Sequence, residues 1–195
     1  MTGALFRDSR GREYSPGEVL EALRQVGAGD CRILFVHTDL SFGLPAPGLG
    51  RKGYLDALWA LLRQLGAGTL VFPAFTYSFC NGEDFDVRSS RTSMGALIEH
   101  VRKQPGVRRS LDPLLSMIAV GEEAGLMDLP LGNHSLGPGS GFDHLHRAGG
   151  VKFLFFGAEF AEYFTYVHYV EKMLEVPYRF DMPFHGRITD WEGNT

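Results

Sequence analysis

The stretch Ile33-Leu34-Phe35-Val36-His37-Thr38-Asp39-Leu40-Ser41 sets the fold class of this chain. Its first four residues form a short, continuous apolar run, which is typical of a strand buried in a parallel sheet. Polar residues follow at once, at the position where α/β proteins commonly bind ligands. The residues alone leave two interpretations of this cluster open: a ligand site at His37, or a turn capped by Thr38 or Asp39.

Helices and apolar strands alternate along the rest of the chain. A capping box at Ser15-Pro16-Gly17-Glu18 marks the first helix, with Pro at the first helical position. The apolar patterns predict strands at 33–36, 69–72, 115–120 and 151–156, and helices at 15–26, 54–65, 93–103, from 140 onward, and at 160–174. This order predicts an α/β fold with a mainly parallel central sheet flanked by helices, in one domain over residues 1–195.

The composition is that of a soluble globular protein, with 44% hydrophobic and 22% charged residues. The net charge of -4 and the lack of a basic stripe argue against a nucleic-acid partner. No apolar run reaches the roughly 18 residues that span a bilayer, and the first eight residues show no secretory pattern. Cys31 and Cys80 are too few for a disulfide framework, so we expect a cytoplasmic location.

His168 and Glu171 are the strongest candidate pair for chemistry. They lie three positions apart on the predicted helix 160–174, so their side chains share one face. A carboxylate beside an imidazole orients the ring and stabilises its protonated form, which suits a general base. The same spacing also fits a histidine with a purely structural role, and that alternative stays open.

Other reactive residues show weaker patterns. Cys80 lacks a thiol-protease signature, so a buried, inert thiol is the preferred interpretation. His134, His144 and His146 match no standard zinc spacing, and we expect a solvated cluster without metal. The glycine-rich run 135–141 fits neither the dinucleotide fingerprint nor the phosphate-binding P-loop, so it predicts a turn followed by a helix cap.

Several blocks of the chain, in order and spacing, resemble the aminoglycoside 3-N-acetyltransferase family. The resemblance runs from about Ile33 to Arg179. The blocks are Val36-His37-Thr38-Asp39-Leu40-Ser41, Pro73-Ala74-Phe75-Thr76-Tyr77, Thr92-Ser93-Met94-Gly95-Ala96-Leu97, Val107-Arg108-Arg109-Ser110-Leu111-Asp112-Pro113, Gly137-Pro138-Gly139-Ser140, Phe164-Thr165-Tyr166-Val167-His168-Tyr169-Val170-Glu171 and Val176-Pro177-Tyr178-Arg179. The resemblance implies an antibiotic N-acetyltransferase-like fold, acetyl-CoA as cosubstrate, and direct attack by a substrate amine without a covalent enzyme intermediate.

The resemblance also implies roles for individual residues. His168 takes the position of the family's catalytic histidine, with Glu171 beside it. The residues expected at the acetyl-CoA site are His37, Thr38, Ser41, Thr76, Met94, Gly95 and Ser110. The residues expected to contact the substrate are Tyr77, Asp112, and Glu83 in an acidic loop that either attracts a cationic sugar or is simply solvated.

Two departures from the family pattern shape the expected function. Asp112 stands where the resistance enzymes commonly have histidine, and with Tyr77-Ser78-Phe79-Cys80 it resembles a branch associated with surface-polysaccharide genes. We therefore expect acetylation of a nucleotide-linked amino sugar. The family chain usually continues well beyond the block ending at Arg179, so a C-terminal portion is expected to be missing.

Three alternatives stay open: an aminoglycoside 3-N-acetyltransferase of antibiotic resistance, a shortened non-catalytic CoA-binding relative, and a thioester hydrolase using Cys80 or Ser78. The expected partners are acetyl-CoA and an amino sugar. Neither nucleic acid nor membrane is expected, and a homo-oligomer is left open.

Overall fold

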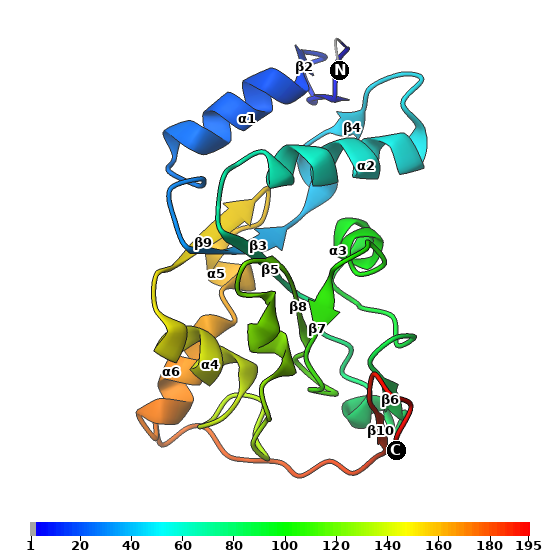
Figure 1. Ribbon diagram of the computed structural model, residues 1–195. Helices are drawn as coiled ribbons and strands as arrows, with labels where there is room; N and C mark the ends of the chain where they lie inside the picture. The colour runs from blue at the N-terminus through cyan, green and yellow to red at the C-terminus, as the bar shows by residue number, and fades with distance from the viewer. Residues whose placement is uncertain (1–2) are drawn as a thin grey trace.

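A five-stranded mixed sheet organises the computed structural model, which describes residues 3–195 (Figure 1). Its order is β7-β8-β5-β3-β9, and the strands are β3 (Ile33–Thr38), β5 (Thr69–Pro73), β7 (Arg108–Arg109), β8 (Met117–Gly121) and β9 (Val151–Phe156). Strands β5, β3 and β9 are parallel, whereas β8 is antiparallel to both β5 and β7. The predicted α/β class is confirmed. The antiparallel pairing of β8 with β5 and β7 was not predicted, because an apolar run does not show in which direction its strand runs in the sheet.

Helices cover both faces of the sheet because alternate residues of each central strand point in opposite directions. Leu34 and Val36 pack with helices α1, α2 and α3, whereas Ile33 and Phe35 pack with η3, α4 and α6. The bounds are α1 (Pro16–Gln25), α2 (Gly50–Arg63), α3 (Ala96–Val101), η3 (Ala124–Asp128), α4 (Gly141–Ala148), α5 (Phe160–Tyr163) and α6 (Tyr166–Met173). Two apolar layers therefore enclose the sheet.

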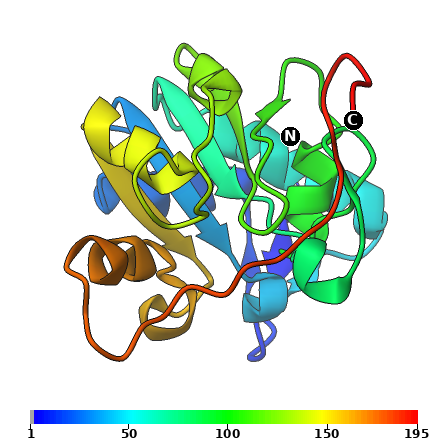
Figure 2. The ribbon, with the colours of Figure 1, turned by 90° about the horizontal axis from the view of Figure 1, so that it is seen from below.

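Two small sheets and two short helical turns complete the elements. The first sheet has the antiparallel order β2-β1-β4, and the second pairs β6 with β10 in parallel. The bounds are β1 (Phe6–Arg7), β2 (Glu13–Tyr14), η1 (Leu40–Phe42), β4 (Leu44–Pro45), η2 (Phe79–Asn81), β6 (Phe85–Asp86) and β10 (Ile188–Thr189). Residues 178–187 form an extended strap that runs from the end of α6 across the molecule to β10 (Figure 2).

The predicted helix starts depended on local caps, and two of them are confirmed. Ser15 and Glu18 form the capping box of α1, and the Ser140 hydroxyl accepts the Asp143 N–H at the start of α4. The predicted helix 93–103 is wrong at its start, since α3 begins at Ala96. The Ser93 hydroxyl donates to the Phe75 carbonyl instead of capping a helix.

The predicted helix 160–174 is two helices, because the chain breaks between α5 and α6. Phe164 has ψ of 69°, outside the helical range. Its ring packs edge-on against Phe153, with centroids 5.1 Å apart. Nearby, the Tyr163 hydroxyl donates a 2.9 Å hydrogen bond to Asp39. These long-range contacts override the continuous helical pattern. The predicted helix 54–65 is also corrected, because α2 begins four residues earlier at Gly50.

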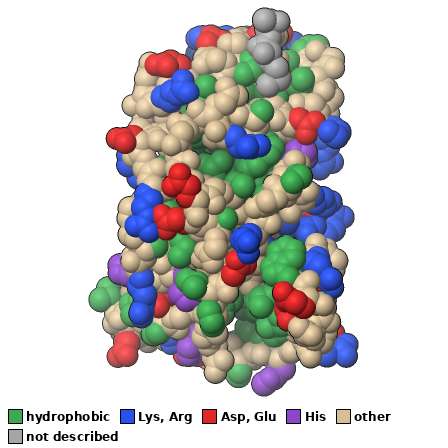
Figure 3. All heavy atoms as spheres, viewed as in Figure 1, with side chains coloured by type: hydrophobic (Ala, Val, Ile, Leu, Met, Phe, Trp, Pro, Cys, Tyr) green, Lys and Arg blue, Asp and Glu red, His purple; other side chains and the backbone are tan. Residues whose placement is uncertain are grey.

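On the face drawn in Figure 3, acidic and basic side chains are interspersed among apolar ones. Within residues 3–195, no helix combines the length and the apolar character needed to cross a membrane.

Candidate functional site

A glycine allows the chain to turn from β9 toward the helices that carry His168. Gly157 has φ of +72°, and a Cβ there would lie 2.2 Å from the Asp39 carbonyl oxygen and 2.3 Å from a Phe42 ring carbon. Neither contact is sterically possible for another residue. The close approach places the start of α5 directly against the 39–42 turn, at the carboxyl end of β3.

His168 and Glu171 meet on α6, as their spacing predicts. His168 Nδ1 lies 3.0 Å from Glu171 Oε2. The His168 side chain is 42% exposed and that of Glu171 is 20% exposed, so the pair is accessible to a ligand. The side-chain contact with His168 is the main cause that lowers the pKa of Glu171, followed by those with Tyr178 and Arg179. Glu171 is therefore a carboxylate at neutral pH.

The chain reverses after α6 and brings two further residues to Glu171. Glu175 has φ of +50°, and the Val176 N–H donates to the Glu171 carbonyl, which is the pattern of a left-handed C-cap. The Tyr178 hydroxyl then donates to Glu171 Oε1 at 3.0 Å, and Arg179 Nε donates to Oε2 at 2.7 Å. Arg179 Nη2 also contacts His168 Nδ1.

Tyr178 and Arg179 were not predicted as site residues. The only signal in the sequence was the family-like block Val176-Pro177-Tyr178-Arg179, which carries no helical or strand pattern that would place it on α6.

His37, expected at the acetyl-CoA site, lies buried near the carboxyl end of β3, between β5 and β9. Its ring stacks on Phe155, with centroids 5.2 Å apart and planes within 4°. Burial lowers the pKa of His37 to about 4, so the ring is neutral at neutral pH. Its Nε2 is buried without a hydrogen-bond partner among the described residues. Thr38, the last residue of β3, is half-buried, and Ser41 in the following turn is exposed.

The other residues expected at the acetyl-CoA site gather around Phe75. The Phe75 carbonyl accepts hydrogen bonds from the Thr92 hydroxyl at 3.0 Å and from the Ser93 N–H at 2.9 Å. This ties the segment carrying Met94 and Gly95 to the end of β5. Gly95 has φ of +95° and open space around its α-carbon.

Thr76 and Ser110 join this cluster from its other side. The Thr76 hydroxyl donates to the Pro113 carbonyl at 2.7 Å. The buried Ser110 hydroxyl accepts the Met117 N–H at 3.0 Å. The structure therefore brings together the blocks 73–77, 92–95 and 110–113, which are far apart in the sequence.

The three residues expected to contact the substrate lie in different environments. Tyr77 is 39% exposed with φ of +56°, and Glu83 is exposed. Asp112 is 6% exposed, and burial raises its pKa even though its Oδ1 accepts three hydrogen bonds. The donors to that oxygen are the N–H groups of Leu114 and Leu115 and the hydroxyl of Ser135. Asp112 thus holds the following turn at 113–115 and the segment around Ser135 in place. Its contact with substrate stays a prediction.

Cys80 does not have the environment that was expected. It is exposed rather than buried, because it lies in the surface turn η2. The expected solvated histidine cluster is wrong for one member, since His144 is half-buried and the part of the chain that the structure describes offers its Nδ1 no hydrogen-bond partner. Among residues 3–195, no group of three or more His, Cys, Asp or Glu side chains could hold a metal ion.

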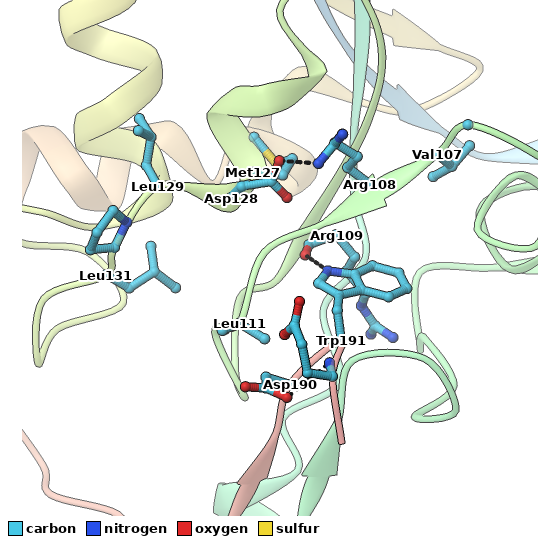
Figure 4. Close-up of a pocket in the computed structure, with 13 residues that line it drawn as sticks. Val107, Arg108, Arg109, Leu111, Met127, Asp128, Leu129, Leu131, Asp190 and Trp191 are labelled. Atoms are coloured by element: carbon cyan, nitrogen blue, oxygen red, sulfur yellow. Dashed lines mark hydrogen bonds and ion pairs between the residues drawn. The ribbon is translucent and has the colours of Figure 1, made fainter. Parts of the chain in front are cut away.

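Two hollows in the structure lie away from the predicted residues. One of about 710 Å³ is formed by β7, η3 and residues 190–192, with Trp191 hydrogen-bonded to the Arg109 carbonyl (Figure 4). Trp191 also lines a second hollow of about 190 Å³. None of the predicted site residues lines either hollow.

Comparison with known proteins gives a consistent result. The aminoglycoside 3-N-acetyltransferase family profile matches residues 35–193. Aminoglycoside N(3)-acetyltransferase III proteins from Salmonella sp. and Enterobacter cloacae are 31% identical over 191 residues, which cover 87% of this chain. The chain spans 65% of the length of these curated relatives, slightly less than two thirds.

Solved structures show the same relationship. The apoenzyme of aminoglycoside acetyltransferase AAC(3)-IVa superposes with a TM-score of 0.68 at 28% identity, covering 84% of this chain and 62% of that one. AAC-IIIb in a binary complex with coenzyme A superposes with a TM-score of 0.54 at 27% identity, covering 71% and 58%.

Proposed function

Because this chain belongs to the aminoglycoside 3-N-acetyltransferase family, we propose that it transfers an acetyl group from acetyl-CoA to an amino group of an aminoglycoside, with His168 as the general base. The observation that carries the proposal is the 3.0 Å contact between His168 and Glu171 on an accessible face of α6. AAC-IIIb, a structural neighbour, binds coenzyme A, which supports acetyl-CoA as the donor.

The chemistry requires a proton acceptor beside the substrate amine. An ammonium group cannot attack a thioester until it loses a proton, and a positioned imidazole accepts that proton. When Nδ1 carries the ring proton, it donates to Glu171 Oε2, and the lone pair of Nε2 is then free for the substrate. Within residues 3–195 the structure shows no hydrogen-bond partner for Nε2.

Residues at the carboxyl ends of β3 and β5 fit a role in holding the donor. Nε2 of His37 is a buried polar atom without a hydrogen-bond partner among residues 3–195, and the nearby Thr38 and Ser41 are half-buried and exposed, respectively. A Cβ on Gly95 would meet no atom of residues 3–195 within 4 Å, so there is open space beside its backbone. Acetyl-CoA supplies the thioester. Holding it within reach of the amine makes the attack effectively unimolecular, which lowers the barrier further.

An aminoglycoside replaces the nucleotide-linked amino sugar as the proposed acceptor. The relatives found by sequence are named for aminoglycosides, and they favour an aminoglycoside 3-N-acetyltransferase of antibiotic resistance over an enzyme of surface-polysaccharide synthesis. Aminoglycosides are polycations, so the exposed Glu83 and the half-exposed Tyr77 are reasonable contacts for them.

The test measures release of coenzyme A thiol with a panel of aminoglycosides and one nucleotide-linked amino sugar. We expect release with aminoglycosides. His168→Ala should lower kcat at least about 10²-fold, with coenzyme A affinity by calorimetry largely unchanged. His185→Ala, which removes an exposed histidine of the strap, is the matched control and should keep its activity.

Three results would point elsewhere. Undiminished turnover in His168→Ala removes the histidine from the mechanism. Coenzyme A binding without release for any amine supports the shortened, non-catalytic relative. Thiol release without an acceptor, abolished by Cys80→Ala, supports a hydrolase.

A further inference from the structure

A carboxylate and a guanidinium face the same ring nitrogen of His168. Nδ1 lies 3.0 Å from Glu171 Oε2 and is also in contact with Arg179 Nη2. An ionised carboxylate can only accept a hydrogen bond, whereas a guanidinium can only donate one. The two neighbours therefore require opposite protonation of Nδ1.

The donor groups of Arg179 favour one of the two states. Its Nε donates to Glu171 Oε2 at 2.7 Å, while its Nη2 contacts His168 Nδ1. Each N–H can thus serve one acceptor, provided that Nδ1 offers its lone pair. A proton on Nδ1 would face a guanidinium N–H, and a protonated imidazole would add repulsion between two cations.

From this geometry, and resting on the proposed function, we propose that Arg179 is a positioning residue that selects the tautomer of His168. While the guanidinium contacts Nδ1, the ring proton resides on Nε2, so this nitrogen cannot accept a proton from the substrate. When the guanidinium leaves, the proton moves through solvent from Nε2 to Nδ1. The Nδ1–H group then binds Glu171, and Nε2 gains the lone pair that the base requires.

The local structure permits this change without moving the backbone. The Arg179 N–H donates to the Val176 carbonyl at 3.2 Å, which fixes the turn, while the side chain is 35% exposed and can rotate. Glu171 keeps its Tyr178 hydrogen bond when Arg179 departs. A polycationic substrate has the same sign of charge as Arg179, so its arrival would favour displacement of the guanidinium.

The test determines the ring tautomer of His168 directly, by ¹⁵N NMR of the chain labelled at histidine nitrogens. The His168 signals are assigned with a His168→Gln variant, and spectra are recorded at one fixed pH for all variants. We expect mainly the Nε2–H tautomer in the unaltered chain. In Arg179→Met, which keeps the length of the side chain but has no donors, we expect mainly Nδ1–H. Arg179→Ala is a second variant should the first fold poorly.

Arg187→Ala is the matched control, because it removes the other arginine that ties the strap to the body of the protein, through Asp84 at 2.7 Å. We expect its His168 tautomer to match that of the unaltered chain. An unchanged tautomer in both folded Arg179 variants would overturn the proposal, as would an equal change in Arg187→Ala. The NMR measurement of the tautomer needs no turnover. A chain that fails to acetylate would therefore refute the proposed function but would not decide whether Arg179 selects the tautomer of His168.

Discussion

The Tyr169 hydroxyl donates a 2.9 Å hydrogen bond to Asp143 Oδ1, and this bond joins α6 to α4 one residue away from His168. Tyr169 is 3% exposed and Asp143 is 2% exposed, so water does not compete for the bond. Asp143 Oδ2 accepts the Gly139 N–H at 2.8 Å and pairs with Arg147 at 2.9 Å. One carboxylate thus connects the glycine-rich turn, α4 and the helix of the candidate base.

Tyr169→Phe removes this hydroxyl and little else. We expect the free energy of unfolding to fall by about 1–3 kcal/mol, because a buried hydrogen bond to a charged group is lost. Urea denaturation measures this change in the free energy of unfolding. Tyr14→Phe, which removes an equivalent bond from Tyr14 to Asp8 near the surface, should have a smaller effect. Equal stability of Tyr169→Phe and the unaltered chain would show that α6 is held by apolar packing alone.

His37 should make the stability of the fold depend on pH. Burial lowers its pKa from 6.5 to about 4, so the unfolded chain takes up a proton at a higher pH than the folded chain does. The stability associated with neutral His37 is complete above pH 6.5 and is lost as the pH falls toward 4. The loss should approach roughly 3 kcal/mol. In His37→Phe, the difference in unfolding free energy between pH 7 and pH 4.5 should shrink accordingly; an unchanged difference contradicts this account.

Glu175 occupies a backbone conformation that suits glycine. Its φ of +50° places it at the left-handed position of the C-cap of α6. Glu175→Gly should raise the free energy of unfolding by about 0.5–1 kcal/mol, since it relieves the steric cost of a Cβ in this region. Glu175→Ala retains the Cβ and should give no such gain. Thermal unfolding compares the two variants, and a less stable glycine variant would argue against strain at this turn.

Asp112 offers a test that separates its structural role from a role in substrate binding. All three of its hydrogen bonds go to Oδ1, and an asparagine oxygen can accept the same three. Asp112→Asn should therefore stay within about 1 kcal/mol of the unaltered stability, whereas Asp112→Ala should lose about 2–4 kcal/mol by leaving buried N–H groups unpaired. If the carboxylate also contacts a cationic substrate, Asp112→Asn should raise KM while stability is kept. An unchanged KM would leave only the structural role.

Local patterns in the sequence were sufficient for most of the elements. The apolar runs at 33–36, 69–72 and 151–156 became the three parallel strands, and the Ser15 and Ser140 caps start their helices as predicted. These features depend on residues within a few positions of each other. The spacing of His168 and Glu171 is also local, so their contact could be predicted from the sequence.

Contacts between distant parts of the chain decided the rest. The break between α5 and α6 involves Tyr163 and Asp39, which are 124 positions apart. The buried state of Asp112 depends on Ser135 and on the turn at 113–115. Arg179 reaches His168 only because Glu175 reverses the chain. The sequence by itself therefore determined the three parallel strands, the caps at Ser15 and Ser140, and the pairing of His168 with Glu171. The tertiary structure alone decided which charged groups surround that base, because such groups are brought together by chain reversal and packing rather than by spacing.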